Sequence, residues 1–160
     1  MSDVDHSLRV LLVEDDENKK QRILSFYESS FPQDTVFWAP ALVPGLRKAK
    51  EISPDFIILD MTLPNYEQYG SNGYNPMRPF GGREFLRQAA RLRLNSKIVV
   101  VTQFETFGAA PNVVDLESLD HQLRSIFPEH YLGAIYYHAS MSAWQKKLSD
   151  ARQRCEGSSQ

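Results

Sequence analysis

Five short apolar runs recur along the chain, and each has the pattern of a strand. The run at residues 56–59 is the clearest, because four apolar residues follow one another with no polar position between them. Such a run is typical of a parallel strand that is buried on both faces. The other runs lie at residues 8–13, 35–39, 97–102 and 132–137.

Between these runs the apolar period becomes helical, near residues 18–27, 44–52, 83–94, 115–126 and 142–151. Strand and helix therefore alternate five times. This order predicts an α/β fold, a doubly wound five-stranded parallel sheet with helices on both faces and right-handed crossovers.

The first predicted helix, at residues 18–27, is amphipathic. Its apolar residues include Ile23 and Tyr27, which fall on one face at helical spacing. Lys19, Lys20 and Arg22 are interpreted as lying off that face.

The chain of 160 residues is expected to form one domain over residues 1–155. Two long connections, at about 65–82 and 103–114, lack a helical or strand period, and residues 156–160 are predicted to be a disordered tail. The first connection is either a cover or docking element beside the site or simply disordered.

Composition narrows the class of protein. A net charge of −2 and a pI of about 6.1 argue against a dedicated nucleic-acid surface. No apolar stretch is long enough to span a membrane, and the start of the chain lacks the basic residues of a signal peptide. The single cysteine, Cys155, is interpreted as an exposed thiol in a polar tail, and a lone cysteine fits a reducing, cytoplasmic compartment.

Polar side chains gather where the predicted strands end. Glu14 and Asp15 follow the first strand, and Asp60 follows the third. The carboxyl ends of parallel strands meet at one edge of a sheet, so these acids are expected to lie together. Clustered carboxylates repel unless a cation neutralises them, and their oxygens suit Mg²⁺. Thr102 and His138 end the fourth and fifth strands, and a phosphoryl-handling site is indicated.

The chain resembles the CheY-like receiver domains of two-component response regulators. The residues that carry the resemblance are the segments 13–17 (Val-Glu-Asp-Asp-Glu), 59–64 (Leu-Asp-Met-Thr-Leu-Pro) and 101–102 (Val-Thr). The resemblance covers nearly the whole chain, and it implies the strand order 2-1-3-4-5 that the CheY fold has.

The resemblance implies a role for each matching residue. Asp60 corresponds to the phosphoacceptor, which takes a phosphoryl group from a sensor histidine kinase or phosphotransfer protein. Glu14 and Asp15 correspond to residues that bind Mg²⁺, together with Asp60 and the backbone carbonyl of Thr62. Thr102 corresponds to the hydroxyl that contacts the phosphoryl group and moves toward it.

The chain departs from the family pattern in its fifth strand. The family ends this strand with a lysine that binds the phosphoryl group, whereas the matching position here is taken to be His138. We expect His138 to take over that contact. The aromatic residue that the family places three positions earlier is matched by Ile135.

Three hypotheses follow. The first is a phosphorylatable receiver that signals through contacts with a downstream effector protein, with a homodimer allowed and no nucleic acid or membrane partner expected. The second is a degenerate receiver that binds a protein without phosphorylation, which His138 and Ile135 favour. The third is an aspartyl-phosphate phosphatase, because Asp60-Met61-Thr62 resembles the start of the haloacid-dehalogenase motif. That motif's second aspartate is absent, so the protein is expected not to be an enzyme.

Overall fold

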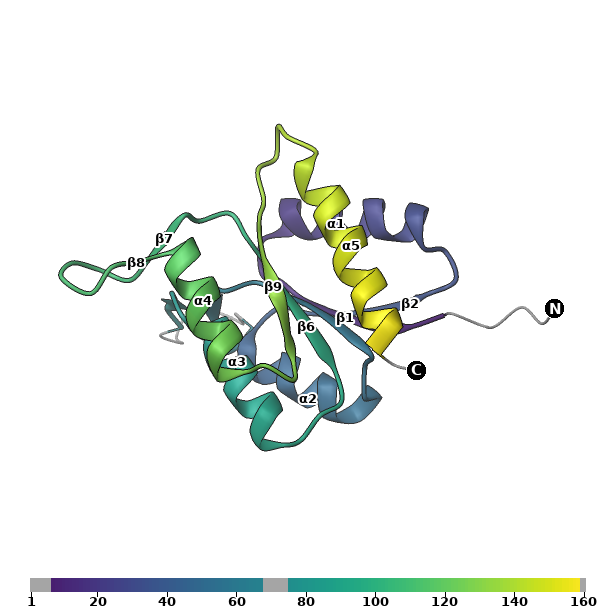
Figure 1. Cartoon of the computed structure of the whole chain (residues 1–160), viewed down its shortest axis with the longest axis horizontal. Coiled ribbons are helices and arrows are strands. Elements are labelled where there is room, and N and C mark those ends of the chain that lie inside the picture. Colours follow the sequence, from purple (N-terminus) through teal and green to yellow (C-terminus); the bar gives the residue numbers. More distant parts are fainter. Residues whose placement is uncertain (1–6, 68–74, 159–160) are drawn as a thin grey trace.

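The centre of the protein is a five-stranded parallel sheet, seen in a computed structural model that describes residues 7–67 and 75–158 (Figure 1). Neighbouring strands pair in the same direction throughout the sheet. Across the sheet the strands are β2 (Thr35–Ala39), β1 (Arg9–Val13), β3 (Phe56–Leu59), β6 (Lys97–Thr102) and β9 (Tyr131–Tyr136). Numbered along the chain, these five strands have the order 2-1-3-4-5, which confirms the predicted fold class.

Five helices cover the two faces of the sheet (Figure 1). Consecutive residues of a strand point to opposite faces, so Val10 packs in one apolar cluster and Leu11 in the other. This burial on both faces explains why the strand sequences are apolar without interruption. One face carries α1 (Glu17–Ser30) and α5 (Ala143–Ser158), and the other carries α2 (Leu42–Ile52), α3 (Gly81–Arg91) and α4 (Leu116–Ile126).

The two long connections each hold a short antiparallel ladder. β4 (Leu63–Pro64) pairs with β5 (Met77–Arg78), and β7 (Thr106–Phe107) pairs with β8 (Val114–Asp115). Strands of two residues are too short to show the alternation of apolar and polar residues, so the sequence does not predict them. Residues 68–74 of the first connection lie outside the described residues.

The last helix corrects the interpretation of Cys155. The helix α5 continues to Ser158, past residue 155 where the predicted domain ends, and residues 159 and 160 lie outside the described ranges. Cys155 is buried, and its Sγ donates a hydrogen bond to the carbonyl of Asp55 at 3.3 Å. It lies four residues after the buried Ala151, so it continues the inner stripe of an amphipathic helix.

No helix within the described ranges is both long enough and apolar enough to span a membrane.

Candidate functional site

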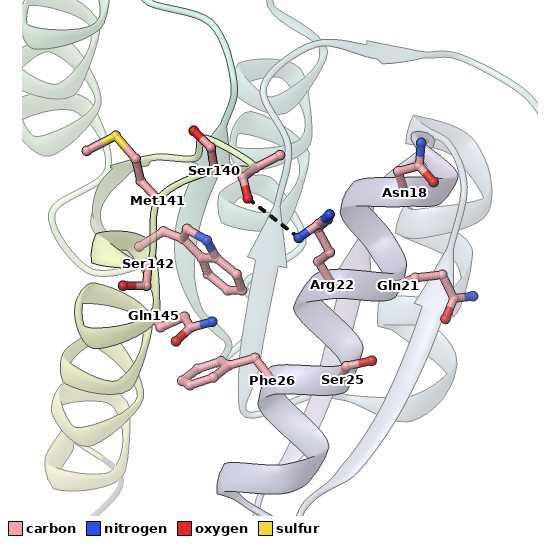
Figure 2. A pocket seen from close by; sticks show the side chains of 11 residues that line it. Asn18, Gln21, Arg22, Ser25, Phe26, Ser140, Met141, Ser142 and Gln145 are labelled. Atoms are coloured by element: carbon pink, nitrogen blue, oxygen red, sulfur yellow. Dashed lines mark hydrogen bonds between the residues drawn. The ribbon is translucent and has the colours of Figure 1, made fainter.

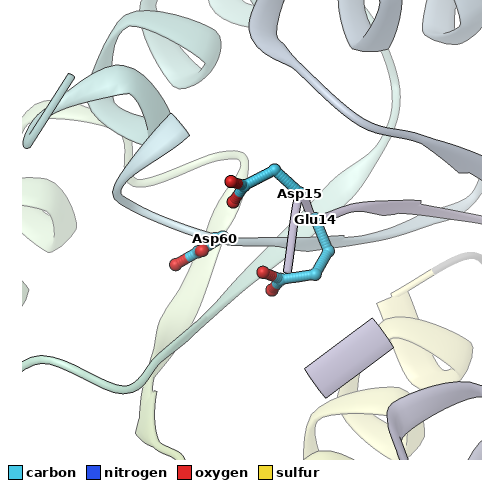
Figure 3. A group of neighbouring side chains, drawn as sticks. All are labelled: Glu14, Asp15 and Asp60. Atoms are coloured by element: carbon cyan, nitrogen blue, oxygen red, sulfur yellow. The ribbon is translucent and has the colours of Figure 1, made fainter. Parts of the chain in front are cut away.

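The ends of β1 and β3 bring three carboxylates together. Val13 and Leu59 are partners in the sheet, so the residues that follow them, Glu14 and Asp60, lie side by side. The backbone N–H of Asp60 donates to the carbonyl of Val13 at 3.0 Å and fixes this arrangement. Carboxylate oxygens of Glu14, Asp15 and Asp60 all lie within 4.8 Å of one another (Figure 3). We call these three residues the acidic rim.

The four consecutive acids at residues 14–17 divide into two pairs with different roles. Glu14 is buried and Asp15 is half-buried, and both belong to the acidic rim. Asp16 caps helix α1, because its side chain accepts hydrogen bonds from the backbone N–H groups of Asn18 and Lys19. Glu17 begins the helix and faces solvent, where a negative charge is favourable beside the helix N-terminus.

Lys19 enters the acidic rim from helix α1. Its side chain is 1% exposed, and its Nζ donates to the carbonyl of Val101 at 2.7 Å. The same atom lies 2.8 Å from Glu14 Oε1 and 3.2 Å from Asp60 Oδ1. The prediction that Lys19 lies off the apolar face of its helix is therefore wrong, because Lys19 is buried on that face with Ile23 and Tyr27.

The sequence did contain a signal for the position of Lys19. Lys19, Ile23 and Tyr27 recur every fourth residue, and all three are buried on the inner stripe of α1. The neighbouring Lys20 is on the outer side, where its Nζ lies 3.4 Å from Glu17 and 3.6 Å from the centre of the Trp38 ring. Both lysines were predicted to lie off the apolar face, because a lysine is rarely buried unless a charged group pairs with it.

The acidic rim carries more negative than positive charge. Burial, followed by the nearby charge of Asp60, raises the pKa of Glu14 well above its usual value, although Lys19 opposes this shift. Burial and the charge of Asp60 also raise the pKa of Asp15, to about 6. For Lys19, burial lowers the pKa, but the Asp60 and Glu14 carboxylates raise it by more, so its net shift is upward.

A divalent cation fits this arrangement. Asp60 is 5% exposed, and its Oδ1 accepts no hydrogen bond within the described part of the chain, although Lys19 Nζ lies nearby. A buried carboxylate oxygen without a hydrogen bond is costly unless a cation binds it. The three acids offer only oxygen ligands, which are the ligands that Mg²⁺ prefers.

Helix α3 packs tightly behind Asp60. The backbone N–H of Gly82 donates to the carbonyl of Met61 at 2.8 Å. A Cβ atom at Gly82 would lie 2.6 Å from the backbone oxygen of Asp60, so this close approach requires glycine. Thr62 lies just beyond, half-buried, and the metal-binding role of its carbonyl stays a prediction.

Thr102 ends β6 and is fully buried. Its Oγ1 accepts a hydrogen bond from the backbone N–H of Phe104 at 3.1 Å, and its backbone carbonyl accepts one from Tyr137 at 2.7 Å. Its partner in the neighbouring strand is Tyr136, which is half-buried, whereas the buried Ile135 pairs with Val101. The aromatic residue Tyr136 therefore lies beside Thr102. The resemblance to the family had matched the aromatic position to Ile135, one residue earlier.

His138 lies at the surface, two residues beyond the end of β9. Its Nδ1 accepts a hydrogen bond from the backbone N–H of Ser140 at 3.2 Å, and Ser140 Oγ lies 2.8 Å from the same nitrogen. Its ring also lies 6.5 Å, centre to centre, from that of Tyr136. The structure thus places this imidazole against its own loop, and a phosphoryl-contacting role for it stays a prediction.

A groove of about 760 Å³ opens on the side of α1 that faces α5 (Figure 2). Arg22 crosses it, and its Nη1 donates to the carbonyl of Ala139 at 3.5 Å. Asn18 lines the groove, whereas the adjacent Lys19 enters the acidic rim. Helix α1 therefore connects the rim with the surface. The groove is lined by Asn18, Gln21, Arg22, Ser25, Phe26, Ala139, Ser140, Met141, Ser142, Trp144 and Gln145.

Comparisons with known proteins find relatives that match most of the chain. No protein-family model matches the chain. An uncharacterized protein, y4jR of Sinorhizobium fredii, is 39% identical over 146 residues, which are 91% of this chain and 97% of that protein. The Detocs response regulatory protein DtcB of Enterobacter cloacae is 25% identical over 141 residues, 86% of this chain and 94% of that protein.

Solved structures show the same fold. A CheY-like response regulator receiver domain protein from Methanospirillum hungatei superposes with a TM-score of 0.62. The match covers 94% of this chain and 97% of the other, at 20% sequence identity. At this identity the likeness is one of fold, and the roles of single residues depend on the geometry of this site.

Proposed function

We propose that the chain is a CheY-like receiver domain of a two-component response regulator and that it accepts a phosphoryl group on Asp60. The observation that carries this proposal is the state of the Asp60 carboxylate. It is nearly buried beside two other acids, yet its Oδ1 accepts no hydrogen bond in the described part of the chain. A carboxylate without a hydrogen bond on that oxygen is free to act as a nucleophile.

The donor we propose is a phosphohistidine on a sensor histidine kinase or a phosphotransfer protein. An oxygen of Asp60 attacks the phosphorus, and an O–P bond forms as the P–N bond breaks. The electron pair of the broken bond stays on the imidazole nitrogen, which then takes up a proton. The product is an aspartyl phosphate, a mixed anhydride that water can hydrolyse.

Glu14, Asp15, Asp60 and the carbonyl of Thr62 would hold Mg²⁺ in this proposal. When bound, the ion would neutralise the charge that the rim and the phosphoryl oxygens share. The chain's own contribution is positioning. The β1–β3 pairing holds the two acids that follow the strands, and Gly82 lets helix α3 pack directly behind the acceptor.

A protein partner for the output is also proposed. Relatives of this chain are named as response regulatory proteins, and the groove beside α1 is lined by Asn18, the neighbour of Lys19 in the same helix. A charge added at Asp60 would act first on the groups around it, among them Lys19 of α1, and through them on a surface.

Intact-mass analysis after incubation with acetyl phosphate and Mg²⁺ tests the proposal. Wild-type protein should gain one phosphoryl group that alkali removes, and Asp60→Asn should gain none. Asp16→Asn is the matched control, because Asp16 caps the helix and is not part of the acidic rim. An Asp60→Asn protein that still gains the group would show that the acceptor is elsewhere.

The second candidate is a receiver that binds its partner without phosphorylation. It is favoured by the surface position of His138, which leaves the last strand without the basic contact expected of the family. Wild-type protein that binds Mg²⁺ but gains no phosphoryl group would select this candidate.

A further inference from the structure

The last strand brings no lysine to the acidic rim. The sequence has no lysine between Lys97 and Lys146, and β9 is followed by Tyr137 and His138. Tyr137 is buried, and the His138 ring accepts a hydrogen bond from the backbone N–H of Ser140 in the same loop. A phosphoryl group on Asp60 would therefore depend on a cation from another element of the fold.

Lys19 is such a cation, and its position is fixed from several directions. Its backbone N–H donates to the capping side chain of Asp16 at 3.1 Å, which holds the first turn of α1 in place. Its Nζ then reaches the ends of β1, β3 and β6 through Glu14, Asp60 and Val101. The Tyr137 ring lies 5.9 Å from the same nitrogen.

We propose that Lys19 is the phosphoryl-contacting cation of this site, and that helix α1 supplies it in place of a lysine on the last strand. The inference rests on the proposed function, because it assigns a contact to the phosphoryl group on Asp60. Lys19 is not among the residues that carry the resemblance to the family.

The geometry around Asp60 supports this role. Lys19 Nζ lies 3.2 Å from Asp60 Oδ1, so it is already beside the atoms that take part in the transfer. Lys19 Nζ donates to the carbonyl of Val101 and lies 2.8 Å from Glu14 Oε1, whereas Asp60 Oδ1 accepts no hydrogen bond from the described residues. The ammonium can therefore turn toward an added phosphoryl oxygen while it keeps its contacts with Val101 and Glu14.

The change in charge points the same way. Transfer replaces the single negative charge of the Asp60 carboxylate with the two charges of a phosphoryl group. The additional charge appears where Glu14 and Asp15 already repel it. A buried ammonium at this point stabilises the product and the transition state before it more than it stabilises the free carboxylate.

A purely structural counter-ion would behave differently. It would hold α1 against the sheet whether or not a phosphoryl group is present, and a lysine from another element could not replace its effect on phosphorylation. The two roles are separated by measuring acyl-phosphate formation, Mg²⁺ affinity and unfolding in the same set of variants.

The test uses Lys19→Met, which keeps the length of the side chain and removes its charge. Lys20→Met is the matched control, since Lys20 is the next residue of the same helix and contacts Glu17 and Trp38 instead of the rim. In Lys19→Met with Tyr137→Lys, the ammonium returns to the rim from the end of β9, as the Tyr137 ring already adjoins Lys19.

With acetyl phosphate and Mg²⁺, Lys19→Met should form acyl phosphate about tenfold more slowly or worse, the effect of losing one charged hydrogen-bond donor. Its Mg²⁺ affinity, measured by calorimetry without acetyl phosphate, should equal or exceed that of wild type because the competing ammonium is gone. Lys20→Met should match wild type in both measurements. The double variant should recover part of the lost rate.

Two results would overturn the inference: a Lys19→Met rate equal to wild type, or a rate and a Mg²⁺ affinity that fall together. In either case wild type still gains its phosphoryl group, so the proposed function stands. If wild type itself gains none, the proposed function fails and the inference falls with it.

A measurement on wild-type protein keeps the inference testable even if Lys19→Met does not fold. In protein labelled with ¹⁵N at lysine Nζ, beryllofluoride with Mg²⁺ serves as the phosphoryl analogue. The Lys19 Nζ signal should shift on its addition beyond the shift that Mg²⁺ alone causes. An unchanged signal would show that Lys19 does not contact the phosphoryl position.

Discussion

The two ends of the sheet each bury a cation among carboxylates, and they differ in how fully those groups are satisfied. At the amino end, Arg152 donates to both oxygens of Asp34, from Nε at 2.7 Å and from Nη2 at 2.8 Å. Asp34 also accepts hydrogen bonds from the Tyr27 hydroxyl at 2.6 Å and the backbone N–H of Leu8 at 2.9 Å. The Arg152 guanidinium also lies 3.6 Å from Glu156 Oε2, and both oxygens of Asp34 accept hydrogen bonds.

At the carboxyl end, one ammonium meets three carboxylates, and Asp60 Oδ1 accepts no hydrogen bond from any described residue. The amino-end cluster joins α5 to α1 and to the segment before β2, so it stabilises the fold. The acidic rim keeps excess negative charge, and Asp60 Oδ1 has Lys19 as its ionic partner but accepts no hydrogen bond from the described residues, as suits a reactive site. Complete hydrogen bonding therefore distinguishes a buried ion pair that stabilises the fold from one that belongs to a reactive site.

The largest effect should come from breaking the amino-end cluster. Asp34→Asn removes the charge of the carboxylate nearest to the buried guanidinium of Arg152, so the free energy of unfolding should fall by about 3 kcal/mol. Urea denaturation followed by circular dichroism measures the loss. Asp150→Asn removes an exposed partner of Lys146 and should change stability little. Equal results for the two variants would remove the amino-end cluster as a stabilising element.

Mg²⁺ should act on the carboxyl end alone. At ten times its dissociation constant, the ion should raise the free energy of unfolding of wild type by about 1.4 kcal/mol, since it binds the folded state. Thermal unfolding with and without Mg²⁺ measures the increment. Asp34→Asn should keep this increment because its site is at the other end of the sheet, and Asp15→Ala should lose most of it. A full increment in Asp15→Ala would exclude Asp15 from the metal site.

The smallest effect should be a gain in stability. Asp60→Asn in metal-free buffer should raise the free energy of unfolding by about 1 kcal/mol, because one of three mutually repelling carboxylates loses its charge. The same substitution at Asp34 lowers stability, so equivalent changes at the two ends should have opposite signs. A clear loss of stability in Asp60→Asn would mean that the attraction between Lys19 and Asp60 exceeds the repulsion of Asp60 by the other two carboxylates.

The fold could be predicted from the sequence because burial on both faces leaves uninterrupted apolar strands. Glu14, Asp15 and Asp60 were predicted to lie together for a related reason, since each follows such a strand and the structure places all three within a few ångströms. Arg152 and Asp34 are 118 residues apart in the sequence, and no pattern in the sequence predicts that they pair.

The remaining differences come from contacts that a one-dimensional pattern does not contain. Lys19 was predicted to lie off the apolar face of its helix, because its burial depends on carboxylates that follow the ends of two strands. His138 was predicted to end the fifth strand, but β9 ends at Tyr136. The backbone N–H of Tyr137 still donates to the carbonyl of Thr102, and His138 lies in the turn that follows.

Reductive trapping of the acceptor tests the central claim most directly. Borohydride reduces an aspartyl phosphate to an alcohol and leaves free carboxylates unchanged, so peptide mapping of wild-type protein treated with acetyl phosphate and Mg²⁺ identifies the modified residue. We expect the alcohol at Asp60 and nowhere else in the chain. A modified residue at any other position, or no modified residue at all, would contradict the assignment of Asp60 as the phosphoryl acceptor.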